Sequence, residues 1–307
     1  MRFFSLRGKA QRVPGSMLFL GVFVVLMMVL SACGSTTAST NVPTPNASTP
    51  TVTAPTDLIT PGTLTVGSDT TYPPQEYIDS TTGKAAGFDI DLITAIAQRM
   101  GLKVDIVSTD FNTIIDSLTA KRFDVVISAV TINADRQEKV DFVPYFSAGE
   151  SLLVPKGNPK NITSITDACG LTVGVQNGTV EQSDAQAASD ACKKAGKPAI
   201  TLTALQDQTA VVQLLATKRV DATYQDSPVT DYYLLQNPGQ FQVGGSVVNA
   251  APEGIAVRKG DSSMLNAVQT SFNQLKSAGT YDALFKKWDL DDSQKISFIK
   301  PRDPSVA

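Results

Sequence analysis

A short stretch of this sequence combines small residues, a hydroxyl group and an arginine in an order that could hold a carboxylate. An apolar run ends at Ser128 and Ala129, and Thr131 follows. Arg136 then falls in the first turn of a predicted helix, where its charge opposes the helix macrodipole. Backbone N–H groups at the helix start and the guanidinium fork would both suit a small ligand's carboxylate. The alternative is an ordinary surface arginine after a strand-to-helix turn, and this segment alone does not decide between the two.

Two further turns in the second half of the chain carry residues of the same kind. Gly178 and Thr179 form a turn between a predicted strand and a helix predicted at 180–194, and the N–H groups around this turn, that of Val180 included, could meet an anion. Asp226 follows another apolar strand and would suit either an N-cap or a ligand contact. Each turn alone is a weak signal, and the two roles of Asp226 are compatible at the mouth of a cleft.

Three residues could form the part of a site that meets a ligand's side chain. Tyr72 precedes a proline, which favours an extended backbone and can aim the ring away from the local core. Phe111 lies in a strand-to-helix turn without a hydrophobic partner at the staple position, so core packing and ligand stacking both stay open. Asp69 is either the acceptor of an Asx-turn or a polar contact of the ligand.

The amino terminus has the pattern of an export signal followed by a lipid attachment site. Four basic residues precede the apolar run 17–30, and no acidic residue occurs before Asp57. This pattern is typical of a secretory signal, and the run is too short for a comfortable transmembrane span. Leu30-Ser31-Ala32-Cys33 resembles a lipobox, which predicts cleavage after residue 32 and acylation of Cys33. The lipid would tie the protein to the outer face of the cytoplasmic membrane; a plain signal anchor with an incidental cysteine is the alternative.

The composition after this signal limits the partners. Residues 33–62 are rich in Thr, Ser and Pro, which predicts a disordered tether because such a segment cannot bury a core. The signal holds four of the 26 basic residues and none of the 29 acidic ones, so the mature chain has a net charge of −7. No basic cluster remains, which disfavours nucleic acid and anionic lipid surfaces as partners.

The cysteine and histidine content narrows the chemistry further. Cys169 and Cys192 are the only cysteines besides Cys33, and in an exported protein we expect them to form a disulfide. Histidine is absent, which excludes Ser-His-Asp and Cys-His mechanisms and the commonest zinc sites. We therefore expect no metal and no cofactor.

Strand and helix signals alternate in two rounds. The first round runs from a strand at 64–67 to one at 124–129, and the second from a strand at 171–175 to one at 222–224, each with two helices between. This order predicts an α/β fold of two lobes, each a mainly parallel sheet flanked by helices. Ligands of such sheets bind outside the carboxyl ends of the strands, where the residues above fall.

Several of these segments together match the pattern of a known family. The segments that carry the match are GSDTTYPP, GFDIDL, TINADR, DFVPY, VGVQNGT and VDATYQDSP. Over residues 63–290 the sequence resembles the extracytoplasmic solute-binding proteins that serve bacterial ABC importers of polar amino acids. The resemblance implies the two-lobed type II periplasmic-binding-protein fold, with two crossing strands between the lobes. It places lobe 1 at 63–153 and 250–290 and lobe 2 at 154–249, before a tail at 291–307.

The resemblance also implies a role for each site residue. Arg136 would bind the α-carboxylate with the help of Thr131 and the N–H of Val180, and Asp226 would bind the α-ammonium with the carbonyl of Ala129. Tyr72 and Phe111 would flank the ligand side chain, and Asp69 would meet its polar end. Two further contacts are expected from Ser128 and Thr179. Relatives often carry hydroxyl residues at positions 129 and 180, so only backbone contacts are expected there.

We therefore expect a binding protein, not an enzyme, that captures a polar or basic amino acid and delivers it to an ABC permease. We expect the protein to be monomeric and anchored by a lipid. An acidic Asp69 at the side-chain end is the reason to expect a polar or cationic ligand. One alternative is a dehydratase of cyclic carboxylic acids on the same fold, with Asp69 and Asp226 as its acid/base pair. Another is a sensory protein that presents its ligand to a membrane receptor.

Overall fold

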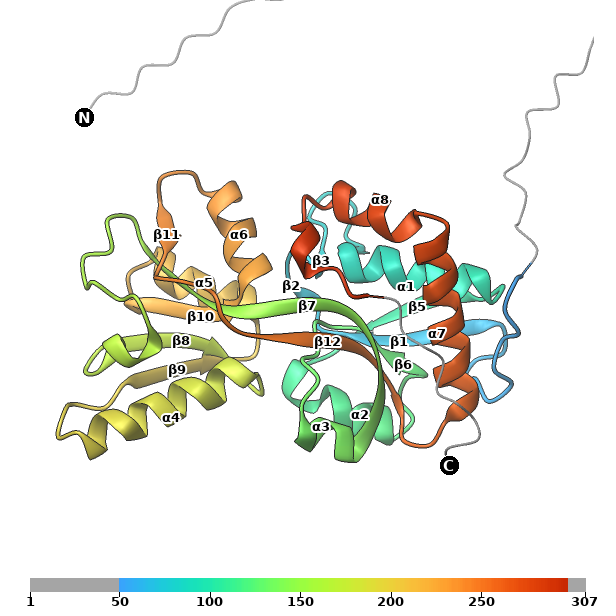
Figure 1. Cartoon of the computed structure of the whole chain (residues 1–307), viewed down its shortest axis with the longest axis horizontal. Coiled ribbons are helices and arrows are strands. Elements are labelled where there is room, and N and C mark those ends of the chain that lie inside the picture. The colour runs from blue at the N-terminus through green and yellow to red at the C-terminus, as the bar shows by residue number, and fades with distance from the viewer. Residues whose placement is uncertain (1–49, 298–307) are drawn as a thin grey trace, which may run out of the picture. The chain divides into compact units, whose positions relative to one another are not determined.

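The computed structural model describes residues 50–297, so the predicted signal sequence, Cys33 and residues 298–307 lie outside the described residues. Strands of both lobes join in one sheet with the order β5-β1-β6-β12-β7-β10-β8-β9, and β11 pairs with β7. Two long antiparallel strands, β7 (Val140–Pro155) and β12 (Val248–Arg258), run from one lobe to the other (Figure 1). The lobe boundaries expected at 153/154 and 249/250 fall inside these two strands.

Lobe 1 is organised around three parallel strands covered on both faces. β1 (Thr63–Ser68) lies between β5 (Lys103–Ser108) and β6 (Val125–Val126), and its residues after Thr63 are all buried. Burial on both faces is typical of a parallel strand between helical layers. The helices of this lobe are α1 (Phe88–Arg99), α2 (Ile114–Thr119), α3 (Ala134–Lys139), α7 (Ser262–Ser277) and α8 (Thr280–Lys287).

The two faces of lobe 1 have separate cores. Helices α1, α7 and α8 pack on one face around Phe88, Phe272 and Phe285, all fully buried. Helix α2 packs on the other face through Ile114 and Leu118. A small antiparallel sheet of β2 (Thr71–Tyr72), β3 (Glu76–Ile78) and β4 (Ala85–Ala86) extends the loop after β1.

Lobe 2 repeats the arrangement. β8 (Thr172–Gln176) lies between β9 (Thr201–Leu205) and β10 (Ala222–Asp226), and all three are parallel, while β11 (Phe241–Val243) pairs antiparallel with β7. The helices are α4 (Val180–Lys194), α5 (Gln208–Ala216) and α6 (Ser227–Gln236). Helices α4 and α5 pack into different cores of this lobe, so its sheet is also covered on both faces.

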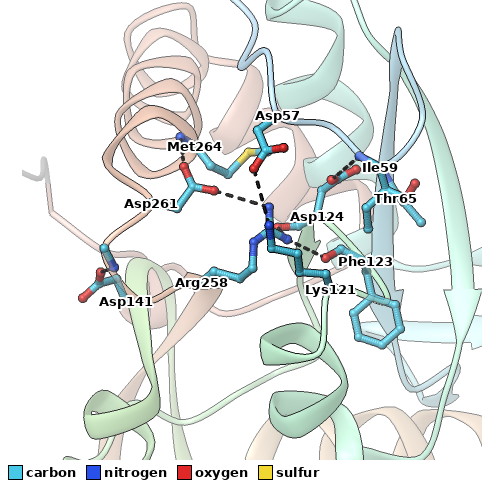
Figure 2. Close-up of polar contacts among 11 residues, drawn as sticks. Asp57, Ile59, Thr65, Lys121, Phe123, Asp124, Asp141, Arg258, Asp261 and Met264 are labelled. Carbon is cyan, nitrogen blue, oxygen red and sulfur yellow. Dashed lines mark hydrogen bonds and ion pairs between the residues drawn. The ribbon is translucent and has the colours of Figure 1, made fainter.

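A polar network closes lobe 1 at the amino ends of its strands (Figure 2). The buried carboxylate of Asp124 accepts hydrogen bonds from the N–H groups of Ile59, at 3.0 Å, and Thr65, at 2.9 Å. At the end of β12, Arg258 donates from Nη1 to the carbonyl of Phe123 at 2.8 Å and lies 3.4 Å from a carboxylate oxygen of Asp261. The network thus fixes the segment before β1 and the last residue of β12 to the same end of the lobe.

Residues 50–62, which the sequence predicts to be part of a disordered tether, are packed against lobe 1. The N–H groups of Thr51 and Val52 donate to the carbonyl of Arg99 at 2.9 and 3.0 Å, and Val52, Ala54 and Leu58 pack against the core of lobe 1. The packing of these apolar side chains holds residues 50–62 against lobe 1. The composition of the segment, which is mostly Thr and Pro, gave no sign of this packing.

The predicted disulfide is confirmed. Cys169 precedes β8 and Cys192 lies in α4, with Cα atoms 5.7 Å apart and a sequence separation of 23 residues. Within residues 50–297 no helix combines the length and the apolar character needed to cross a bilayer.

Candidate functional site

A small cavity of about 10 Å³ lies where the two lobes meet, and side chains and turns of both lobes form its wall. Of the ten ligand contacts predicted from the sequence, nine line this cavity: Tyr72, Phe111, Ser128, Ala129, Thr131, Arg136, Thr179, Val180 and Asp226. Gln176 and Glu181 complete the lining, and neither was expected there from the sequence.

Arg136 reaches from lobe 1 across to lobe 2. Asn133 caps α3 by accepting a hydrogen bond from the N–H of Arg136 at 2.9 Å, which confirms the predicted helix start. The guanidinium donates to the carbonyls of Thr131, at 2.7 Å, and Gly178, at 3.1 Å, and lies 5.3 Å from the ring centroid of Phe111. Burial lowers the pKa of Arg136 below its usual value. Arg136 is the one cation among the residues that line the cavity.

Asp226 stands at the end of β10, in the N-cap position of α6, but its side chain does not cap the helix. Instead the carboxylate accepts a hydrogen bond from the hydroxyl of Tyr72 at 2.8 Å, and the backbone N–H of Asp226 donates to the same hydroxyl oxygen at 3.1 Å. Burial raises the pKa of Asp226 to about 6, against the opposing effects of Tyr72 and Arg136. Tyr72 therefore links lobe 1 to the acid of lobe 2.

The small residues after β6 serve a tight backbone turn. Ala129 has φ 45°, in the left-handed region that residues other than glycine rarely adopt. Its N–H donates to Asp89 at 3.1 Å, and the hydroxyl of Ser128 donates to Glu76 at 2.8 Å. Burial raises the pKa of Asp89 to about 6 and that of Glu76 well above its usual value. Hydrogen bonds to buried acids thus hold the strained turn in the wall of the cavity.

Asp69 is the one predicted contact that does not line the cavity. Its carboxylate accepts hydrogen bonds from the hydroxyl of Thr71, at 2.8 Å, and from the side-chain amide of Gln176. Burial raises the pKa of Asp69 to about 6. Gln176, at the end of β8, lines the cavity instead and lies between Asp69 and the cavity. Asp69 would therefore act on a ligand by orienting the amide of Gln176.

The start of α4 supplies the lobe 2 wall. Helix α4 begins at Val180 as predicted, and the hydroxyl of Thr179 accepts from the N–H of Gln182 at 3.1 Å. Glu181, in the first turn, is only 2% exposed. Burial, followed by the charge of Asp226, raises the pKa of Glu181 well above its usual value. An acid in the first turn of a helix is explained by the macrodipole alone, so the sequence gives no sign that Glu181 lines a cavity, and only the arrangement of the lobes reveals it.

The wall therefore combines one guanidinium, two acids, two aromatic rings and backbone groups of two turns. Such a set can bind carboxylate and ammonium groups of one small molecule. Within residues 50–297 no group of three His, Cys, Asp or Glu residues is placed to hold a metal ion.

Comparisons with known proteins identify the family of this chain. The family model of the bacterial extracellular solute-binding proteins, family 3, matches residues 64–291. An arginine-binding protein of Corynebacterium glutamicum is 32% identical over 232 residues, which are 75% of each chain. An L-cystine-binding protein of Bacillus subtilis is 30% identical over 274 residues, which are 89% of this chain and 96% of that protein.

A solved structure extends the agreement to the fold. An ancestral arginine-binding protein bound to arginine superposes with a TM-score of 0.69 at 39% identity, covering 74% of this chain and 98% of the other. The predicted fold class, two α/β lobes of the type II periplasmic-binding-protein kind, is confirmed.

Proposed function

Because the chain belongs to family 3 of the bacterial extracellular solute-binding proteins, we propose that it captures a free amino acid in the interlobe cavity and delivers it to the permease of an ABC importer. The observation that carries the proposal is the placement of Arg136 and Asp226, from opposite lobes, in the wall of one small cavity. A free amino acid carries both a carboxylate, which a cation such as Arg136 can bind, and an ammonium group, which an acid such as Asp226 can bind.

The roles of the wall residues follow from their charges. Arg136 binds the α-carboxylate with the hydroxyl of Thr131 and the N–H of Val180, since a guanidinium and a helix N-terminus both favour an anion. Asp226 binds the α-ammonium together with the carbonyl of Ala129. Because these groups come from both lobes, a bound amino acid stabilises the closed arrangement.

Relatives and wall chemistry support a polar or basic ligand. One relative is an arginine-binding protein and another an L-cystine-binding protein, and the two acids in the wall favour a ligand that carries hydrogen-bond donors. The lipobox-like sequence before Cys33 supports export and attachment to the outer face of the membrane by an acyl chain.

The test is a screen of all common amino acids by thermal shift, followed by isothermal titration calorimetry. We expect at least one amino acid, polar or basic, to raise Tm and to bind in a one-to-one ratio. If none of them binds, the proposed function is wrong. Turnover of a cyclohexadienyl carboxylic acid would instead favour the dehydratase alternative, whose acid/base pair would need Asp69 to face Asp226 rather than bond to Thr71 and Gln176.

A further inference from the structure

The cavity wall offers more hydrogen-bond acceptors than the protein itself satisfies. The amide nitrogen of Gln176 donates to Asp69 and, at 2.7 Å, to the carbonyl of Gln206, which fixes the orientation of the amide. Its oxygen Oε1 is buried without a partner, and so is Oε1 of Glu181. Both residues line the cavity. Buried acceptors without partners are costly and rare, so a ligand that fits this wall should bring donors to it.

The residues of the wall also carry more acidic than basic groups, so the wall favours a ligand that brings positive charge as well as hydrogen-bond donors. Arg136 contributes one positive charge, whereas Asp226 and Glu181 contribute two negative charges when ionised. A zwitterionic amino acid adds no net charge, so it would leave one buried carboxylate unneutralised. An amino acid with a cationic side chain adds one positive charge and balances the wall. In a closed cavity an unbalanced carboxylate is costly and takes up a proton instead.

Among the residues that line the cavity, Glu181 creates this imbalance, because Arg136 and Asp226 alone would carry one charge of each sign. Its position in the first turn of α4 sets it beside Val180, whose N–H belongs to the proposed α-carboxylate site, and within electrostatic range of Asp226 and Arg136.

We infer that Glu181 is a specificity-determining residue that selects amino acids with a cationic side chain. The inference rests on the proposed function, because it concerns the ligand of the same cavity. Glu181 supplies the second acid of the wall, which carries a negative charge when a cationic side chain is bound beside it, and Oε1 of Gln176 accepts a hydrogen bond from the ligand, with Asp69 behind the amide. A neutral amide such as glutamine could meet the acceptors but would leave Glu181 protonated, without the ion pair that a cation forms.

The experiment compares ligands that differ only in charge. L-arginine and L-citrulline have nearly the same shape, and citrulline carries a neutral ureido group in place of the guanidinium; L-lysine and L-norleucine form a second pair. Calorimetric Kd values are measured for the unmodified protein and for Glu181→Gln, which keeps the size of the side chain and removes its charge. Glu138→Gln is the matched control, because Glu138 is an exposed residue of α3 and the change in net charge is identical.

We expect the unmodified protein to prefer the cation of at least one pair, and Glu181→Gln to weaken binding of that cation by roughly 10- to 100-fold. Binding of the neutral member should change by less than about threefold, so the preference largely disappears, whereas Glu138→Gln keeps it. An equal loss for both members would assign Glu181 a structural role and overturn the inference.

Tighter binding of a neutral amino acid than of arginine and lysine by the unmodified protein would also overturn the inference while leaving the proposed function intact. Failure of every common amino acid to bind would overturn the proposed function and, with it, this inference.

Discussion

Arg136 occupies a position that helix energetics disfavour. A cation in the first turn of α3 opposes the macrodipole, yet its guanidinium bridges the carbonyls of Thr131 and Gly178 from different lobes. A residue that contributes little to helix stability and lies in the wall of a cavity is expected to serve the ligand.

Replacing Arg136 by alanine should abolish amino-acid binding. The loss of one partner from a desolvated charge pair costs roughly 2–5 kcal/mol of binding free energy, whereas the free energy of unfolding should change by less than about 1 kcal/mol. Arg136→Lys should also bind poorly, because an ammonium cannot reproduce the planar fork. Calorimetry and urea unfolding measure the two quantities. The control is Lys139→Ala, an exposed cation of the same helix; near-normal binding by either Arg136 variant would place the carboxylate site elsewhere.

The buried aspartates give the ligand-free protein a definite pH dependence. Burial raises the pKa values of Asp69, Asp89 and Asp226 to about 6 each, above the value of 3.8 expected in the unfolded chain. The folded state therefore binds more protons than the unfolded state between about pH 4 and pH 6, so the free energy of unfolding falls as pH rises through this window.

Urea unfolding of ligand-free protein should accordingly show greater stability at pH 5 than at pH 7.5. Ligand affinity should change in the opposite direction, because Asp226 must lose its proton to bind an ammonium group. A ligand-free protein that is more stable at pH 7.5 would contradict the assignment of raised pKa values to these aspartates.

Residue types marked Arg136 and Asp226 as candidates, because each stands at a strand-to-helix turn, and the family resemblance then gave each of them a role. The roles of Asp69 and Glu181 could not be read in the same way. Both are acids in turns, where capping and dipole effects explain them equally well. Which acid meets the cavity depends on Gln176, whose amide covers Asp69, and this contact joins residues far apart in sequence.

At the scale of elements, Gly178 shows how closely the lobes approach. A Cβ atom at this position would lie 2.7 Å from the Cα atom of Asn112 in lobe 1, and its φ is 81°. The conformational strain of a side chain at such a φ is present in open and closed forms alike, whereas the clash arises only when the lobes meet.

Gly178→Ala should therefore weaken ligand binding by roughly fivefold or more, since a closing cost of about 1 kcal/mol lowers the population of the binding-competent form. The matched control is Gly196→Ala, where φ is 72° and no atom lies within 4 Å of the added Cβ. That variant should lose stability without losing affinity. Equal affinities of the two variants, measured by calorimetry, would show that the lobe contact at Gly178 does not govern binding.

The disulfide should stabilise lobe 2 without serving the ligand. In the chain-entropy model a loop of this length is worth about 3 kcal/mol, and neither Cys169 nor Cys192 lines the cavity. We expect the double variant Cys169→Ala/Cys192→Ala to lose most of that free energy of unfolding and to keep its ligand affinity. A loss of affinity in the folded double variant would show that the disulfide positions the site.

Strands with a plain apolar run were easier to predict than interrupted or very short ones. The predicted strands at 64–67 and 171–175 match β1 and β8. By contrast, β7 spans 16 residues, of which only the apolar run near its end stood out, because a proline and a glycine interrupt the alternation of the rest. The strands β2 and β4 have two residues each, too few for any periodicity to reveal.

At the scale of the whole molecule, the proposed attachment to the membrane depends on one cysteine, Cys33, which lies outside the described residues. Cys33→Ala, expressed in a bacterial host, should leave the membrane fraction or stay unprocessed, because no acyl chain can be added. Fractionation followed by immunoblotting measures the change, with Cys169→Ala/Cys192→Ala as the cysteine control that stays membrane-bound. An unchanged distribution of Cys33→Ala would refute lipid anchoring.

The contacts of residues 50–62 determine where a mechanical load would enter the protein. Val52 bonds to Arg99, Ile59 bonds to Asp124, and the apolar side chains of this segment pack on the core of lobe 1. In a protein anchored through its amino terminus as proposed, tension from the anchor would therefore enter at lobe 1, before the strands β7 and β12 that lead to lobe 2. Lobe 1 would then be the arm held near the membrane and lobe 2 the arm free to move.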